Sequence, residues 1–250
     1  MLKEFTNKHY LPTIVILLEH LKNKSNNKIW KETKMIGLTH GQPATLTSMG
    51  DYFKVFHYRL ETEIKKLIKY KFYTKFGGAV GNLEAHKICY PEINWDKWTK
   101  NFIETDLNLY LQEYTTQIMN YESLVELFNI VMRINSILID FAVDIWLYIS
   151  KEYFHYDNQG NVGSSTMPHK INPILFENAE GNLIMANGIF ETLGRKLPIS
   201  RWQRDLTDST LVRNIGVPFC HSLLSYQNLI DGISRLKLNI DKINQDVKDN

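Results

Sequence analysis

One short block in the second half of the chain gathers the groups best suited to anion chemistry. It reads Gly163-Ser164-Ser165-Thr166-Met167-Pro168-His169-Lys170-Ile171-Asn172. The ammonium of Lys170, the amide of Asn172 and the backbone N–H groups of such a loop can stabilise a developing negative charge. A serine hydroxyl is a poor base unless its alkoxide is stabilised, and Lys170 is placed to do so for Ser164. The alternative interpretation is a Ser/Thr-rich loop that only caps a helix.

A second block could supply a proton donor. It reads Thr39-His40-Gly41-Gln42-Pro43-Ala44-Thr45. Histidine suits general acid catalysis because its unperturbed pKa lies close to working pH. Taken alone, a histidine in front of a helix is more often a capping or surface residue, so this block gains weight only beside the first one.

A third segment, residues 201–214, could bind a phosphate. Ser209 and Arg213 are four residues apart, so on a helix they share one face. A hydroxyl and a guanidinium near a helix N-terminus make a reasonable phosphate site. The alternative is a surface on which the charges of the segment neutralise one another. Those charges belong to Arg201, Arg204, Asp205 and Asp208.

The elements that would position these blocks are mostly helices. Apolar residues recur at helical spacing, and few segments alternate with period two. The spacing predicts helices over residues 11–21, 44–73, 121–153, 173–193 and 206–236. We expect a short helix opening at Pro91, a kink at Gly216-Val217-Pro218 and a mobile loop over 157–161. Helices this long cannot bury their faces in one small monomer, so the sequence predicts an all-α bundle that forms an oligomer.

Composition excludes several other classes. The 250 residues carry a formal net charge of +2, so no global field favours nucleic acid. The apolar run 134–149 is too short to span a bilayer and contains Asp140 and Asp144. No histidine or further carboxylate joins those two aspartates at metal-ligand spacing. Cys89 and Cys220 form no CxxC, which indicates reduced thiols in a cytoplasmic protein.

The first block resembles the GSxxMxxKxN pattern of the fumarase/aspartase superfamily at every specified position. The resemblance implies the superfamily's long-helix bundle, with residues 1–250 as the central helical domain at the core of a tetramer. It also implies catalysis without a metal or organic cofactor. Ser164 becomes the general base, Lys170 and Asn172 hold the substrate carboxylates, and His40, in a THxQxA-like segment, protonates the leaving nitrogen.

Other residues resemble the purine-nucleotide branch of this superfamily, the adenylosuccinate lyases. Arg204, Ser209 and Arg213 match a substrate-binding arginine–serine–arginine spacing, and His169 completes the MPHK form of the first block. The resemblance makes Gln117 a substrate contact, Glu177 the group that orients the catalytic histidine, and Asn178 a further substrate contact. The remaining contacts that it implies are Thr39, Gln42, Ser165 and Met167.

The resemblance implies a carbon–nitrogen lyase. By β-elimination it would release fumarate from adenylosuccinate to give AMP, and from the succinylated imidazole carboxamide ribotide. Family active sites are shared between subunits of a homotetramer, with His40, Gln117 and Ser164 coming from different chains. We expect the chain to lack an N-terminal domain and a C-terminal helical domain. The alternatives are another superfamily lyase, argininosuccinate lyase first, or a helical scaffold without catalysis.

Overall fold

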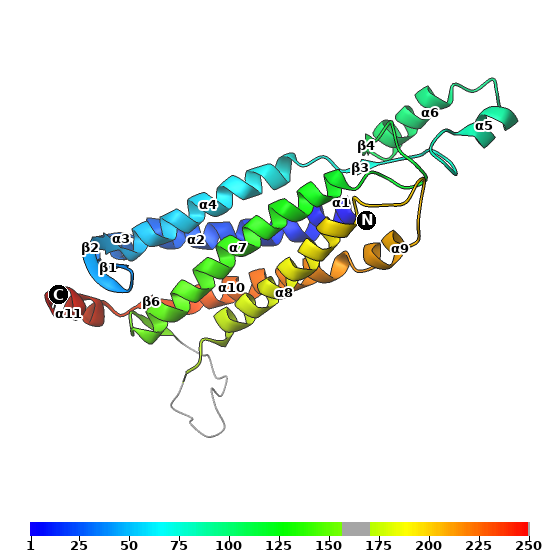
Figure 1. The fold of residues 1–250 in the computed structure, drawn as a ribbon. Coiled ribbons are helices and arrows are strands. Elements are labelled where there is room, and N and C mark those ends of the chain that lie inside the picture. The colour runs from blue at the N-terminus through cyan, green and yellow to red at the C-terminus, as the bar shows by residue number, and fades with distance from the viewer. Residues whose placement is uncertain (157–170, 250) are drawn as a thin grey trace. The chain divides into compact units, whose positions relative to one another are not determined.

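The computed structural model describes residues 1–156 and 171–249, and most of these residues are helical (Figure 1). The long helices are α4 (Met49–Lys69), α7 (Glu122–Ser150), α8 (Ile174–Lys196) and α10 (Gly216–Arg235). The shorter helices are α1 (Leu2–Phe5), α2 (Leu11–Asn26), α3 (Lys28–Glu32), α5 (Glu84–Cys89), α6 (Trp95–Asn101), α9 (Thr207–Val212) and α11 (Ile240–Asp249), with π-helical η1 (Thr6–Tyr10) and η2 (Phe102–Asp106). The predicted all-α class is confirmed.

Short strands form three two-stranded sheets among these residues. The pairs are β1 (Lys34–Thr39) with β2 (Gln42–Ser48), β3 (Tyr73–Thr74) with β4 (Tyr110–Leu111), and β5 (Phe154–Tyr156) with β6 (Leu236–Leu238). The pairs β1–β2 and β5–β6 are antiparallel, and β3–β4 is parallel. Each sheet joins or braces helices, so none forms a separate layer.

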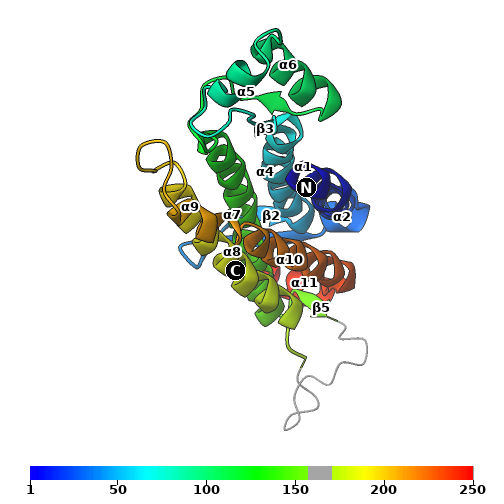
Figure 2. The same cartoon turned by 90° about the vertical axis from the view of Figure 1, so that its right-hand side faces the viewer.

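The chain divides into two compact units. The first comprises residues 1–65, 133–186 and 219–250. Within it, segments of α2, α4, α7, α8 and α10 run alongside one another (Figures 1 and 2). Each segment buries one face at helical spacing. The buried residues include Ile14, Leu17 and Leu21 of α2, Phe53, Phe56 and Leu60 of α4, Ile134, Leu138 and Phe141 of α7, Phe176 and Leu183 of α8, and Leu229 and Ile233 of α10.

A polar network crosses the apolar core of the first unit. The hydroxyls of Tyr10 and Tyr226 are 2.6 Å apart, and Tyr226 also donates to Oδ1 of Asn135 at 2.7 Å. Asn135 in turn donates through Nδ2 to Ser222 Oγ at 2.9 Å. All four side chains are fully buried. Because an unpaired polar group is costly in such a core, the network fixes how η1, α7 and α10 align.

The predicted helix over 44–73 is wrong at both ends. At its end, α4 stops at Lys69 and Tyr73 belongs to strand β3. Residues 44–48 belong to strand β2, and helix α4 begins only at Met49. Ser48 ends the strand and caps the helix, because its Oγ accepts from the backbone N–H of Asp51 at 3.1 Å and donates to the Asp51 carboxylate at 2.8 Å. A serine followed three residues later by an acid is a helix-start signal that outweighed the apolar spacing before it.

The second unit comprises residues 66–132 and 187–218. The parallel pair β3–β4 holds residues 73–74 beside 110–111, and the ladder continues where Gln112 N–H donates to Thr74 O at 2.9 Å. The rings of Phe128 in α7 and Phe190 in α8 pack with their centroids 5.2 Å apart. This unit therefore contains the 70–120 segment, the first turns of α7 and the end of α8.

Three other expectations about the elements need correction. Pro91 lies in a turn, and α6 opens instead at Trp95 behind the capping side chain of Asn94. The predicted helix over 206–236 breaks into α9 and α10 at residues 213–215. Pro218 therefore sits in the first turn of α10, where its missing N–H costs no hydrogen bond, and makes no kink. The helix over 11–21 continues to Asn26. The expected loop over 157–161 lies outside the described residues.

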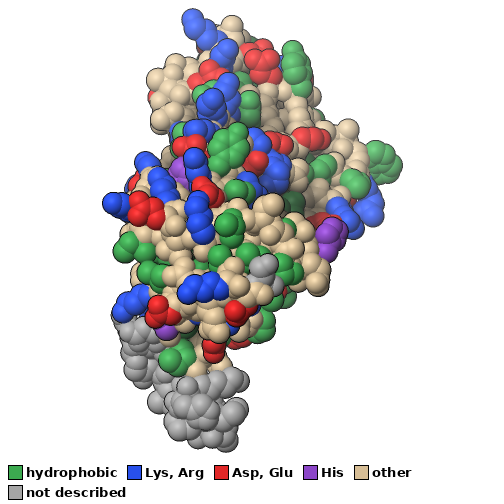
Figure 3. Space-filling view, turned by 90° about the vertical axis from the view of Figure 1, so that its left-hand side faces the viewer, with side chains coloured by type: hydrophobic (Ala, Val, Ile, Leu, Met, Phe, Trp, Pro, Cys, Tyr) green, Lys and Arg blue, Asp and Glu red, His purple; other side chains and the backbone are tan. Residues whose placement is uncertain are grey.

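Basic and acidic side chains are interspersed over the face in Figure 3. Within residues 1–156 and 171–249, none of the helices combines the length and the apolar character needed to cross a membrane.

Candidate active site

The candidate acid, His40, lies at the tip of the β1–β2 hairpin. Thr39 pairs with Gln42, so only His40 and Gly41 form the turn. Their φ angles are +54° and +72°, as a two-residue turn with both central residues in the left-handed region requires. The hairpin therefore presents three predicted site residues at one exposed tip, with a non-glycine residue held in a backbone region that is uncommon outside turns and functional sites.

The candidate base and its neighbours cannot be placed. Ser164, Ser165, Met167 and Lys170 lie outside the described residues. The described chain resumes just before Asn172, which is half-buried and whose carbonyl accepts from the N–H of Ile174 at 2.9 Å. The roles assigned to these residues stay predictions.

The start of α8 carries the next two candidates. Glu177 is exposed and accepts a hydrogen bond from Nε1 of Trp146 in α7 at 2.9 Å. No hydrogen bond joins it to His40 within the described chain, so its expected orienting role is untested. Asn178 is also exposed, and the side chain of Asn182 donates to its side-chain oxygen.

In the second unit, two predicted substrate residues are in direct contact. The guanidinium of Arg204 donates to the side-chain oxygen of Gln117 at 2.9 Å, and the backbone N–H of Gln117 donates to the carbonyl of Gln203 at 3.1 Å. The two side chains come from segments 87 residues apart. The fold therefore brings together two predicted substrate residues that lie far apart in the sequence.

The charges of the 201–214 segment do not cancel as a set. Arg201 pairs with Asp205 at 3.0 Å, and Asp205 also caps α9 by accepting from Thr207 N–H at 2.8 Å. In the described residues Arg204 and Arg213 form no ion pair with a carboxylate, and both are exposed. Ion pairing therefore accounts for Arg201 only, and the other two guanidiniums can accept an anionic ligand.

Ser209 and Arg213 keep the predicted spacing of one helical turn. Ser209 lies inside the six-residue helix α9, and Arg213 is the residue that caps its C-terminal end. The expectation that they lie near a helix N-terminus is therefore wrong for Arg213. The guanidinium itself, more than the helix dipole, must supply the positive charge at this position.

A buried carboxylate anchors α9. Asp208 is 8% exposed, and its Oδ2 accepts from the hydroxyl of Tyr121 at 3.3 Å. Burial, followed by the charge of Asp208, raises the pKa of Tyr121 to about 12. The hydroxyl therefore stays a donor at working pH and ties the start of α7 to the helix that carries Ser209.

Two family models match the chain. One, described as Lyase, matches residues 1–188, and the other, described as Adenylosuccinate lyase C-terminal, matches residues 200–250. The chain belongs to the lyase family. The chain is 51% identical over 224 residues to an adenylosuccinate lyase of Dictyostelium discoideum, covering 88% of this chain and 48% of that protein. It is 43% identical over 244 residues to one of Vibrio cholerae, covering 97% and 53%.

A solved structure shows the same fold. The crystal structure of 3-carboxy-cis,cis-muconate lactonizing enzyme from Pseudomonas putida aligns with a TM-score of 0.78 at 21% identity. The alignment covers 96% of this chain and 53% of that one. The chain spans about half the length of the curated relatives it matches.

Sequence reasoning missed one cation near Arg204. Lys75 follows β3, is half-buried, and has no acidic partner among the residues described. Burial, and then the nearby charge of Arg204, lower the pKa of Lys75. Its position after a two-residue strand gave no periodic signal, so only the fold reveals that it lies near Arg204.

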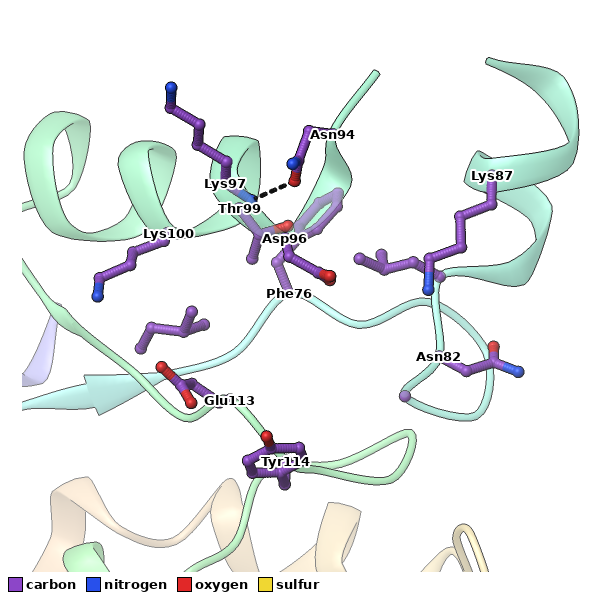
Figure 4. Close-up of a pocket in the computed structure, with 13 residues that line it drawn as sticks. Phe76, Asn82, Lys87, Asn94, Asp96, Lys97, Thr99, Lys100, Glu113 and Tyr114 are labelled. Carbon is purple, nitrogen blue, oxygen red and sulfur yellow. Dashed lines mark hydrogen bonds between the residues drawn. The ribbon is translucent and has the colours of Figure 1, made fainter. Parts of the chain in front are cut away.

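A pocket of about 690 Å³ lies elsewhere in the second unit (Figure 4). It is lined by the lysines Lys87, Lys97 and Lys100 and by the acids Asp96 and Glu113. No candidate residue that the structure describes lines it. Despite its size, this pocket therefore does not coincide with the candidate active site.

Proposed function

We propose that the complete protein is an adenylosuccinate lyase and that this chain supplies the central part of its active site. The contact between Arg204 and Gln117 is the observation that carries the proposal. The contact places the guanidinium of Arg204, which has no carboxylate partner among the described residues, beside the side-chain amide of Gln117. A guanidinium can bind a phosphate and an amide can form hydrogen bonds, so the pair suits a phosphorylated substrate with hydrogen-bonding groups. The match of residues 200–250 to an adenylosuccinate lyase family model supports the same substrate class.

The proposed reaction is a β-elimination. Ser164 removes a proton from the succinyl carbon, and Lys170 and Asn172 hold the carboxylates as negative charge develops. His40 protonates the departing nitrogen, so the carbon–nitrogen bond breaks and fumarate and AMP leave. The hairpin tip supports this role because it exposes the imidazole. The same chemistry would release fumarate from the succinylated imidazole carboxamide ribotide.

Arg204, Ser209 and Arg213 are proposed to bind the nucleotide phosphate. The hydroxyl of Ser209 lies in α9, and the guanidinium of Arg213, which has no carboxylate partner among the described residues, lies at the C-terminal end of that helix. The guanidinium of Arg204 lies three residues before the helix begins. Gln117 keeps the Arg204 side chain in place.

We propose that the protein works as a homotetramer in the cytoplasm, with each active site shared between subunits. Large apolar side chains stay exposed on the long helices, which supports an interface there. They include Val55 of α4, Trp146 and Leu147 of α7, and Ile184 and Met185 of α8. Both cysteines are exposed free thiols, as in a reducing compartment.

The test is turnover of adenylosuccinate by the complete protein, followed by ultraviolet absorbance. Ser164→Ala should abolish turnover with little loss of substrate binding. Arg204→Met should raise KM about tenfold to a hundredfold, because a hydrogen bond to a charged group is worth about 1.5–3 kcal/mol. Arg201→Met is the matched control, since this exposed arginine only pairs with Asp205 and should change KM little.

Two results would contradict the proposal. Cleavage of argininosuccinate but not of adenylosuccinate would favour the other superfamily lyase. A folded tetramer that binds neither AMP nor adenylosuccinate would favour a scaffold without catalysis.

A further inference from the structure

Helices α8 and α10 lie side by side in the first unit and run in opposite directions (Figures 1 and 2). The ring of Phe176 lies so close to Gly232 that a Cβ there would be 2.8 Å from its Cζ. Two turns further back along α10, the hydroxyl of Ser225 donates to the carbonyl of Ala179 at 3.1 Å. These tight contacts fix the spacing and register of the two helices beside the start of α8.

A chain of hydrogen bonds continues along this contact. Nδ2 of Asn182 donates to the backbone carbonyl of Asn178 at 2.8 Å and to its side-chain Oδ1 at 2.5 Å. The Oδ1 of Asn182 lies 2.7 Å from Nδ1 of His221 in α10. Three side chains, two on α8 and one on α10, are thus connected in series.

The chemistry of these groups fixes which atom donates and which accepts in each hydrogen bond. The backbone carbonyl of Asn178 can only accept, so the atom of Asn182 that faces it must be the amide nitrogen. The oxygen of Asn182 therefore faces His221, whose Nδ1 must carry a proton to donate to it. The same amide nitrogen requires an acceptor on Asn178, which is Oδ1. The Nδ2 of Asn178 is then left as a donor, and it donates to none of the described residues.

We propose that Asn182 and His221 are positioning residues that hold the amide of Asn178 with its N–H groups directed outward, to donate to an anionic oxygen of the substrate. The inference rests on the proposed function, in which Asn178 contacts the substrate. The chain of acceptors and donors permits one orientation of the Asn178 amide, and a carboxylate accepts from N–H groups but not from an amide oxygen. The pairing makes the donor available before substrate arrives.

The test compares variants of the complete protein in adenylosuccinate turnover. Asn182→Asp keeps the side-chain shape but replaces the donating Nδ2 by a carboxylate oxygen. That oxygen would face the backbone oxygen and Oδ1 of Asn178, which are also acceptors. The Asn178 amide must therefore turn over, so that its Nδ2 faces residue 182 and its oxygen points toward the substrate. We expect KM to rise about tenfold or more, with kcat changed less than about threefold. Asn182→Leu removes the link without reversing it and should raise KM less than Asn182→Asp.

Variants of His221 provide the rescue. An asparagine amide nitrogen can occupy the place of the imidazole Nδ1, so His221→Asn should keep the wild-type KM. His221→Leu leaves the oxygen of Asn182 without its donor and should raise KM about twofold to fivefold. A merely structural role would lower Tm without separating these two variants in KM.

The outcomes separate the two hypotheses. If the wild-type protein turns over adenylosuccinate but Asn182→Asp keeps its KM within twofold, the positioning role is wrong and the proposed function stands. If His221→Asn and His221→Leu raise KM equally, the donor role of His221 is wrong. If the folded wild-type protein does not act on adenylosuccinate, the proposed function fails and this role fails with it.

Discussion

Replacement of Gly81 by alanine should disturb both the stability and the active site of the protein. Gly81 has φ +91°, and a Cβ added to it would overlap the carbonyl oxygen of Thr115 and lie 2.9 Å from the carbonyl carbon. Carbon atoms pack about 3.5 Å or more apart, so that backbone must retreat by roughly 0.6 Å at least. The positive φ costs alanine about 1–2 kcal/mol, and overpacking adds about 1–3 kcal/mol.

The expected loss in the free energy of unfolding is therefore about 2–5 kcal/mol, a large part of a typical 5–15 kcal/mol. Gly78 in the same turn is the matched control. Its φ is +70°, but the nearest atom to an added Cβ is 3.7 Å away, so Gly78→Ala should lose only the conformational cost of about 1–2 kcal/mol. Urea denaturation of both variants, monitored by circular dichroism, measures the difference.

The same change should reach the proposed substrate site, because Thr115 lies two residues before Gln117. A displacement approaching 1 Å at a positioning residue can lower turnover about a hundredfold. We expect Gly81→Ala to lose the activity of the complete protein at a temperature where it is still folded, and Gly78→Ala to keep it. Equal losses of stability in the two variants would refute the argument from overlap.

Two further predictions concern the first unit. Tyr226→Phe should lower the free energy of unfolding by about 1–3 kcal/mol, because it removes two buried hydrogen bonds, one to Oδ1 of Asn135 and one with the hydroxyl of Tyr10; an unchanged urea midpoint would contradict this. Burial raises the pKa of Asp144, even though the hydroxyl of Tyr52 donates to its carboxylate at 3.0 Å. The carboxyl is therefore harder to ionise in the folded protein than in the unfolded chain. Stability falls as the pH rises above the ordinary aspartate pKa of about 3.9 and through the raised pKa of Asp144 in the folded protein. Asp144→Asn should therefore stabilise the protein at pH 7 and make no difference near pH 2.5, which denaturation at the two pH values would check.

The helical core could be predicted because each long helix repeats its apolar residues every three to four positions over many turns. That signal is strong for α7 and α8, whose predicted ranges differ from the structure by a few residues. It failed at 44–48, where five residues are too few for a period and the decisive information was the cap formed by Ser48 and Asp51. It also failed at 213–215, where the chain turns between α9 and α10 although none of these three residues is a proline or a glycine.

The candidate site was predictable as a set of residues but not as an arrangement. Arg204 and Gln117 were both selected, yet nothing in the sequence indicates that side chains 87 residues apart share a hydrogen bond. His221 gave no signal at all, since its partner Asn182 lies on another helix. Contacts between helices depend on their packing register, which local patterns do not encode.

The two-residue turn at the hairpin tip also limits how this region can change in length. Because Thr39 pairs directly with Gln42, one inserted residue must either lengthen the two-residue turn or shift the pairing of Leu38 with Pro43. A shift would turn the paired side chains beside the turn to the opposite face. The pairing already shifts by one residue between Ile36 and Leu38, so the ladder would have to take up a second irregularity before Ser48, which starts α4. Related sequences should therefore tolerate substitutions along this hairpin far better than insertions or deletions of single residues.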